Sequence, residues 1–191
     1  MMGRKYKGTF GYLKKRRIRS LIRSAFELAA VLAIYFTAWA ILKDNKNVFT
    51  IMAALLCIPT GKSIVDTIMC FLATGCSDDA HARIEEVLAA APGTFPASYD
   101  LYLTGYQKNF ALSHAAVADG AVCALTESDK CDVEEGQKHI RTVLGNDGVT
   151  GYTVRIFRDT DKYIERISRM GGNPATERDA RAMQVLHAVS L

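Results

Sequence analysis

The amino-acid sequence predicts an α/β (α+β) soluble domain with a small mixed sheet, preceded by a two-helix transmembrane hairpin. Basic residues are concentrated at the start of the chain, and two long apolar segments follow them. Helical and strand patterns then alternate in the order αβββαβ followed by αα. We therefore expect a basic cytosolic tail (1–23), a hairpin (24–75) with spans at about 24–43 and 48–72, and a cytosolic domain (77–191).

The tail contains nine lysine and arginine residues and no acidic residue, which leaves 15 basic and 20 acidic residues in the rest of the chain. A basic block directly before an apolar helix is typical of the cytosolic side of a membrane, whereas an evenly basic chain would indicate nucleic-acid binding. We therefore expect a lipid bilayer with anionic headgroups as a partner, and not nucleic acid. The residues assigned to lipid contact are Lys14, Lys15, Arg16, Arg17, Arg19 and Arg23.

The first apolar segment, residues 24–43, carries a single charge, Glu27, near its start before Lys43 ends it. About 20 residues at about 1.5 Å each give about 30 Å, which matches the hydrocarbon core of a bilayer. Tyr35 and Trp39 are aromatic residues of the kind that lie near a membrane interface. A secretory signal peptide is the alternative, but a second apolar segment follows within a few residues, which favours a membrane span.

The second apolar segment, residues 48–75, contains Gly-Lys-Ser at 61–63, the end of a phosphate-binding loop. The loop motif requires a glycine at the position that Leu56 occupies and a preceding β-strand, so we expect neither a nucleotide site nor a cofactor. We expect Pro59 to kink or loosen a membrane helix. The sequence allows two alternatives for this segment, a full crossing of the membrane or a re-entrant path. Lys62 and Asp66, one turn apart, are predicted to form a membrane charge pair.

The charge distribution predicts a cell-membrane protein with two spans and both termini in the cytoplasm, because positive residues remain inside. The five cysteines are scattered and lack the spacing of a metal site. We therefore expect no bound metal.

The soluble domain is predicted to begin with a helix capped by Ser77 and stopped at Pro92–Gly93, followed by a strand over residues 97–106. Asp119–Gly120 joins two apolar runs within 110–127 and predicts a β-hairpin. A helix capped by Asp132, with Glu135 completing a capping box, should end at Gly145. The remaining predicted elements are a strand over residues 149–157, parallel to the second hairpin strand, and helices over 160–170 and 175–189.

The αβββαβ order and the stretch "LSHAAVADGAVCALT" (112–126) resemble the core and hairpin of nuclease-related, restriction-endonuclease-like domains. The resemblance implies metal-binding carboxylates and a lysine, but Ser113, Thr126 and Ser128 stand at those positions, so we expect a degenerate active site. The stretches "YDLYLTGYQKNF", "KHIRTVLGNDG" and "VRIFRD" also resemble an uncharacterised family of bacterial two-span membrane proteins, which implies the architecture and no activity.

The expected function is a membrane-anchored, non-catalytic domain with a binding, regulatory or assembly role toward a protein partner or ligand that the sequence does not identify. The alternative is a membrane-tethered, metal-dependent, nuclease-like enzyme using Asp100, His114 and Glu127. Asp129 and Asp132 also fall near predicted strand ends, and a histidine site would require His81, His139 and His187 to meet His114. Homo-oligomerisation stays open, and a transporter or channel subunit would require it.

Overall fold

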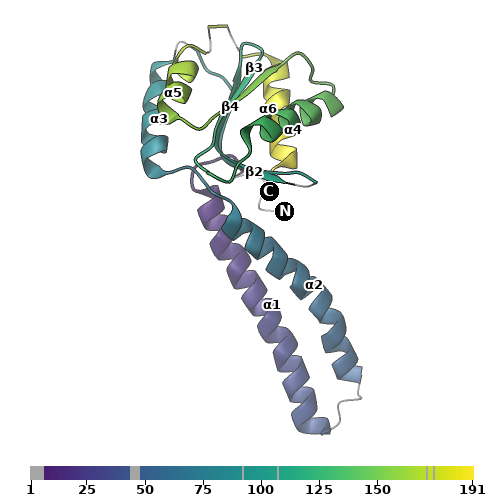
Figure 1. The fold of residues 1–191 in the computed structure, drawn as a ribbon. Helices are drawn as coiled ribbons and strands as arrows, with labels where there is room; N and C mark the ends of the chain where they lie inside the picture. Colours follow the sequence, from purple (N-terminus) through teal and green to yellow (C-terminus); the bar gives the residue numbers. More distant parts are fainter. Residues whose placement is uncertain (1–6, 44–47, 92, 107, 171, 174) are drawn as a thin grey trace. The chain divides into compact units, whose positions relative to one another are not determined.

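The computed structural model describes residues 7–43, 48–91, 93–106, 108–170, 172–173 and 175–191, and it divides the chain into two units (Figure 1). One unit comprises residues 14–72, and the other comprises residues 1–13 together with 73–191. Of the described residues in the predicted tail, 7–13 belong to the α/β unit and 14–23 belong to the hairpin unit. Arg4 and Lys5 of the tail, the link at 44–47 and the helix stop at Pro92 lie outside the described residues.

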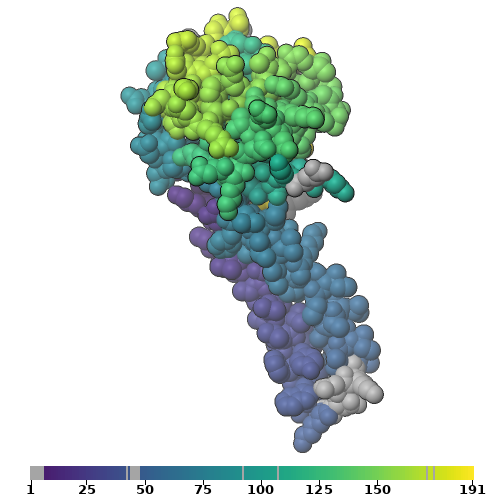
Figure 2. All heavy atoms as spheres, in the orientation of Figure 1, coloured from purple at the N-terminus to yellow at the C-terminus, as the bar shows by residue number. Residues whose placement is uncertain are grey.

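The hairpin unit consists mainly of α1 (Tyr12–Leu42) and α2 (Val48–Leu72), which lie side by side (Figure 2). Both helices are long and apolar enough to cross a membrane, by length and composition. The basic segment after residue 12 is part of α1, because lysine and arginine are good helix formers. α2 is one continuous helix through Pro59, although proline cannot donate to the carbonyl of Leu55. The kink or loosening expected at Pro59 stays a prediction.

The α/β unit has the predicted order of elements, αβββαβ followed by αα. The strands form one sheet in the order β1-β2-β3-β4, in which β1, β2 and β3 are antiparallel and β3 and β4 are parallel. The elements are α3 (Asp78–Ala90), β1 (Ala97–Thr104), β2 (Asn109–Ala118), β3 (Ala121–Leu125), α4 (Val133–Asn146), β4 (Thr153–Phe157), α5 (Thr160–Ser168) and α6 (Glu177–Val189).

The predicted turn and helix caps largely occur as expected. Asp119 and Gly120 have φ values of 52° and 68°, as a two-residue hairpin turn requires. Ser77 accepts a hydrogen bond from Ala80, and Asp132 accepts one from Glu135. The capping box at Asp132 is incomplete, because the Glu135 carboxylate instead lies 2.8 Å from Lys108 Nζ.

Helices cover both faces of the sheet (Figure 1). On one face, Ile140 of α4 and Leu186 of α6 pack with Leu101, Leu112 and other buried residues of the strands. On the opposite face, Ile84 of α3 and Tyr163 and Ile167 of α5 form a second buried cluster with other strand residues. The β-sheet is thus the middle layer of three, and its side chains are shielded from water on both faces.

The edge strand β1 is covered by segments near the two ends of the chain. The Tyr99 amide donates to the carbonyl of Gly8 at 2.9 Å, and the Leu191 amide donates to the carbonyl of Tyr102 at 2.8 Å. Lys7 Nζ joins these segments by donating to the carbonyl of Ser190. Pairing of this kind protects an edge strand from association with other chains.

Candidate functional site

Asp100 lies in the middle of β1 and is buried, with only 3% of its surface exposed. Its φ of 55° lies in the left-handed region, which aspartate adopts more readily than most residues. Tyr99 packs on the α3/α5 face and Leu101 on the α4/α6 face, although residues two apart in a regular strand share a face. The backbone at Asp100 therefore interrupts the alternation of β1 at the level of Ser113 in β2.

The Asp100 carboxylate binds two segments that are far apart in the sequence. The backbone amide of Leu13 donates to Oδ2 at 3.3 Å, and the amide of Cys76 donates to Oδ1 at 2.8 Å. A Cβ atom at Gly75 would lie 2.8 Å from Oδ1, so the close approach requires glycine. Leu13 and Cys76 flank residues 14–72, so one carboxylate joins both ends of the segment that contains the hairpin.

Glu127 holds the residue that follows Cys76. It lies just beyond β3, and its Oε2 accepts a hydrogen bond from the amide of Ser77 at 3.0 Å. Burial, followed by the negative charges of Glu127 and Asp100, raises the pKa of the Cys76 thiol to about 12. Asp100 and Glu127 are therefore brought to the same short segment, as acceptors for consecutive backbone amides.

His114 is completely buried between aromatic rings. Its Nδ1 lies 2.5 Å from the hydroxyl of Tyr163, and its ring centroid lies 4.3 Å from that of Tyr99. Its Nε2 has no hydrogen-bond partner within the described residues. Burial, with a smaller contribution from His81, lowers the pKa of His114 to about 3, so the ring is neutral near pH 7.

Neutral residues occupy the positions at which a nuclease-related domain would carry its metal-binding carboxylates and lysine. Thr126 Oγ1 donates to the carbonyl of Ala111 at 2.6 Å and accepts from the amide of Ser128 at 3.3 Å, and Ser113 is buried. Within the described residues, no group of three or more His, Cys, Asp or Glu side chains is arranged to hold a metal ion.

Asp129 and Asp132 line a cavity of about 460 Å³ beside the start of α4. Lys108 Nζ lies 3.2 Å from Asp132, and Arg158 donates to the carbonyl of Cys131 at 2.7 Å. The backbone amide of Glu135 and then Lys108 lower the pKa of Asp132. Acids and bases balance in the lining, which contains Asp129, Asp132, Glu134, Lys108, Lys130 and Arg158.

The four histidines do not form a composite site. His81 stacks on Phe10 with centroids 3.8 Å apart, and His187 Nε2 lies 2.6 Å from Ser98 Oγ. His139 packs beside Phe110, on the opposite face of the sheet from His114. His81 and His114 both pack against Tyr99, whereas His139 and His187 have other partners.

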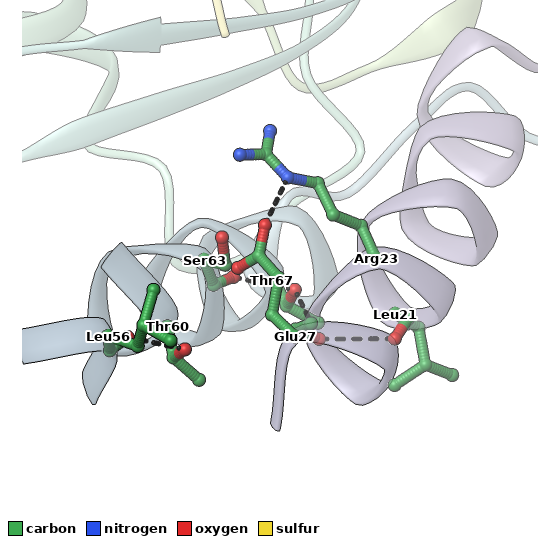
Figure 3. A network of polar contacts seen from close by, with 8 residues as sticks. Leu21, Arg23, Glu27, Leu56, Thr60, Ser63 and Thr67 are labelled. Atoms are coloured by element: carbon green, nitrogen blue, oxygen red, sulfur yellow. Dashed lines mark hydrogen bonds and ion pairs between the residues drawn. The ribbon is translucent and has the colours of Figure 1, made fainter. Parts of the chain in front are cut away.

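The hairpin contains a polar layer between α1 and α2 (Figure 3). Thr67 Oγ1 lies 3.2 Å from Ser24 Oγ and 2.8 Å from the carbonyl of Ser63. Arg23 Nε donates to Glu27 Oε1 at 2.8 Å, one turn away on α1. Small residues at a helix interface let two apolar helices approach closely, and their hydroxyls can bond across it. Further buried small residues of the hairpin are Val31, Ala38, Ala53, Thr60 and Cys70.

Lys62 and Asp66 are both exposed on α2, and no ion pair joins them within the described part of the chain. The predicted lipid-contacting residues occupy the first turns of α1. Lys14, Lys15, Arg19 and Arg23 are exposed there, whereas Arg16 and Arg17 are half-buried. Arg17 Nε donates to the carbonyl of Cys70 at 2.8 Å, which links the start of α1 to the end of α2.

Sequence reasoning did not identify Ser24, Ser63 and Thr67 as contacts between the helices. Their spacing, with a small polar residue about every turn at one end of each apolar segment, is the signal that would have indicated them. It also did not identify the two amides held by Asp100, because hydrogen bonds between residues 87 and 24 positions apart leave no local pattern.

No protein-family model, no curated protein and no solved structure matches this chain.

The first prediction concerns Asp100. Replacing Asp100 by Ala leaves two buried amides without an acceptor, which should lower the free energy of unfolding by about 2–6 kcal/mol at about 1–3 kcal/mol per group. Hydrogen exchange of full-length protein in detergent should accelerate at residues 12–13 and 75–77. Asp129→Ala, an exposed control, should change neither quantity appreciably. Unchanged exchange in Asp100→Ala would show that the carboxylate does not hold these segments.

The second prediction concerns pH. Because the pKa of His114 is about 3 in the folded protein and about 6.5 in an unfolded chain, the unfolded state binds the extra proton between these values. Stability should therefore fall as the pH is lowered below about 6.5, by up to about 1.4 kcal/mol per pH unit.

Urea denaturation of full-length protein in detergent, repeated from pH 7 to pH 4, measures this effect. His114→Asn should reduce the slope of the unfolding free energy against pH by an amount equivalent to at most about one proton. Tyr163→Phe should lower the unfolding free energy but leave that slope unchanged. An identical slope in wild-type protein and His114→Asn would contradict the prediction.

Proposed function

We propose that the protein is a two-span cell-membrane protein whose α/β unit, with both termini, faces the cytoplasm and acts by binding a protein or ligand rather than by catalysis. The observation that carries this proposal is the use of Asp100 and Glu127 as acceptors for backbone amides. A carboxylate occupied in this way has fewer free lone pairs for a metal ion.

The membrane assignment is supported by two helices with mean hydropathies of 1.7 and 1.8 and by their large exposed apolar surface. Exposed apolar side chains on this scale require a covering of lipid or protein. Orientation is supported by the exposed cations of the first turns of α1, which favour the cytoplasmic leaflet. An anchor of this kind concentrates the α/β unit at the membrane surface, where a partner would meet it.

The third prediction tests insertion and orientation. The full-length chain should remain in the membrane after alkaline carbonate extraction. Alkaline phosphatase, which is active only outside the cytoplasm, should be active when inserted between residues 44 and 47 and inactive when fused after Leu191. Complete extraction would contradict the spans, and activity at Leu191 alone would reverse the orientation.

A matched variant tests the cause of the orientation. Replacing Lys14, Lys15, Arg16, Arg17 and Arg19 together by glutamine removes five of the nine positive charges of residues 1–23 and keeps the length of α1. We expect part of the population to insert with the opposite orientation, which would appear as phosphatase activity at the C-terminal fusion.

A second candidate function is a membrane-tethered, nuclease-like enzyme. The observation that favours it is the attachment of Asp100 and Glu127 to the neighbouring amides of Cys76 and Ser77, which brings two acids to one position. Metal-dependent phosphodiester cleavage requires acids grouped in this way around a divalent ion.

The fourth prediction separates the two candidates. Calorimetric titration of the full-length protein in nanodiscs with Mg²⁺, Mn²⁺ and Zn²⁺ should show no saturable binding, and DNA and RNA should stay intact in the same samples. Saturable binding that is lost in Glu127→Ala but kept in Asp129→Ala, together with cleavage, would establish the enzyme and overturn the binding role.

A further inference from the structure

A short strap, residues 7–11, precedes α1 and lies on the outer edge of β1 within the α/β unit. The carbonyl of Gly8 accepts a hydrogen bond from the amide of Tyr99 at 2.9 Å. Lys7 Nζ donates to the carbonyl of Ser190, which directly follows α6. The strap is therefore held at its first residues by β1 and by the end of α6.

Gly8 rests directly on a hydrogen-bonded pair formed by Ser98 of β1 and His187 of α6. Ser98 Oγ lies 2.6 Å from His187 Nε2, and only 3% of the surface of Ser98 is exposed. A Cβ atom at Gly8 would lie 2.7 Å from His187 Cε1 and 2.9 Å from Ser98 Oγ. Gly8 also has a φ of 87°, in the left-handed region that favours glycine. The strap can therefore close on this pair only because residue 8 has no side chain.

Among the described residues, Lys7 of the strap is the charged side chain that acts on His187. Burial, followed by the positive charge of Lys7, lowers the pKa of His187. Ser98, the partner of the ring on β1, is uncharged, and no acidic side chain of the described part of the chain forms an ion pair with His187. A proton on His187 would therefore add a second positive charge beside Lys7 at a half-buried position.

A second histidine contacts the strap from α3, on the opposite face of the sheet. The ring centroids of His81 and Phe10 are 3.8 Å apart, and His81 Nε2 lies 3.9 Å from Glu85 Oε1. A proton on His81 would thus meet an acidic partner, which favours the positive charge. Because that pair is partly exposed, its effect on the strap is small. Protonation opposes the closed strap at His187.

We propose that the strap is a pH-sensitive cover of β1 and that protonation of His187 releases it. Release removes the acceptor of the Tyr99 amide and uncovers the Ser98 hydroxyl, so that an edge of the sheet becomes available to another chain segment. The inference concerns contacts inside the α/β unit and does not depend on the proposed membrane insertion.

The direction of the pH effect follows from proton binding. A histidine that is released into water has a pKa of about 6.5, and the closed strap holds the pKa of His187 below its ordinary value. The released state therefore binds more protons, and the closed population falls as the pH drops below about 6.5.

The fifth prediction follows the amide of Tyr99. Hydrogen exchange of the full-length protein in detergent is measured from pH 7.5 to pH 5.5, and protection is the rate of an unprotected amide divided by the observed rate at the same pH. Protection of Tyr99 should fall about three- to tenfold over this range, because one proton changes the opening equilibrium by at most about tenfold per pH unit. Val122 and Ala124 of the buried strand β3 report global unfolding, and their protection should remain above that of Tyr99.

Two variants test whether His187 is the titrating group. His187→Gln keeps a hydrogen-bonding side chain and should retain protection of Tyr99 without the pH dependence, whereas His114→Asn should keep the dependence. No pH dependence in wild-type protein, or an equal dependence in His187→Gln, would overturn the proposal. If His187→Gln loses protection at every pH, Lys7→Gln decides: a weaker dependence supports the proposal, and an unchanged one overturns it.

Gly8→Ala and Gly11→Ala form a matched pair that tests the contact itself. Both glycines have a positive φ, 87° and 75°, so alanine strains the backbone at either position. An added Cβ at Gly11 meets no atom of the described residues within 4 Å, whereas at Gly8 it meets the Ser98–His187 pair. At pH 7.5, Gly8→Ala should lower protection of Tyr99 about tenfold or more, and at least about threefold more than Gly11→Ala. Equal loss in the two variants would show that the strap does not close on this pair and would overturn the proposal.

Discussion

The Asp100 carboxylate accepts hydrogen bonds from the amides of Leu13 and Cys76, and it thereby holds two distant segments of the α/β unit against β1. The carboxylate is buried, so each amide that lost it would remain unpaired in an environment where unpaired polar groups are costly. Gly75 permits the close approach, and Glu127 extends the same arrangement to Ser77. Any movement of Leu13 or Cys76 must therefore disturb the central part of β1.

Asp100 and Glu127 both lie near the sheet, and both accept hydrogen bonds from backbone amides. Metal-dependent nucleases need carboxylates that converge on an ion, whereas Asp100 and Glu127 converge on backbone amides. His114 of β2 is paired with Tyr99 of β1 in the sheet. Its ring is neutral and packs against Tyr99 and Tyr163. The same strand positions thus serve the attachment of the chain segments that lead to the hairpin.

The hairpin has a different physical requirement, since its large side chains are exposed and need an apolar surrounding. Small residues form the contact between α1 and α2, with Ser24 and Thr67 as its polar members. Lys62 and Asp66 are also exposed on α2. The exposed apolar side chains and these two charges require different surroundings.

The sequence by itself determined the two apolar helices, the order of the elements, the Asp119–Gly120 turn and the caps at Ser77 and Asp132, because each depends on local periodicity or neighbouring residues. It also identified Asp100 and Glu127 as candidate catalytic acids of the alternative enzyme. Only the tertiary structure decided what these acids bind, because Leu13, Cys76 and Asp100 meet through long-range packing. The face change at Asp100 was likewise set by long-range packing, because Tyr99 and Leu101 belong to buried clusters on opposite faces of the sheet.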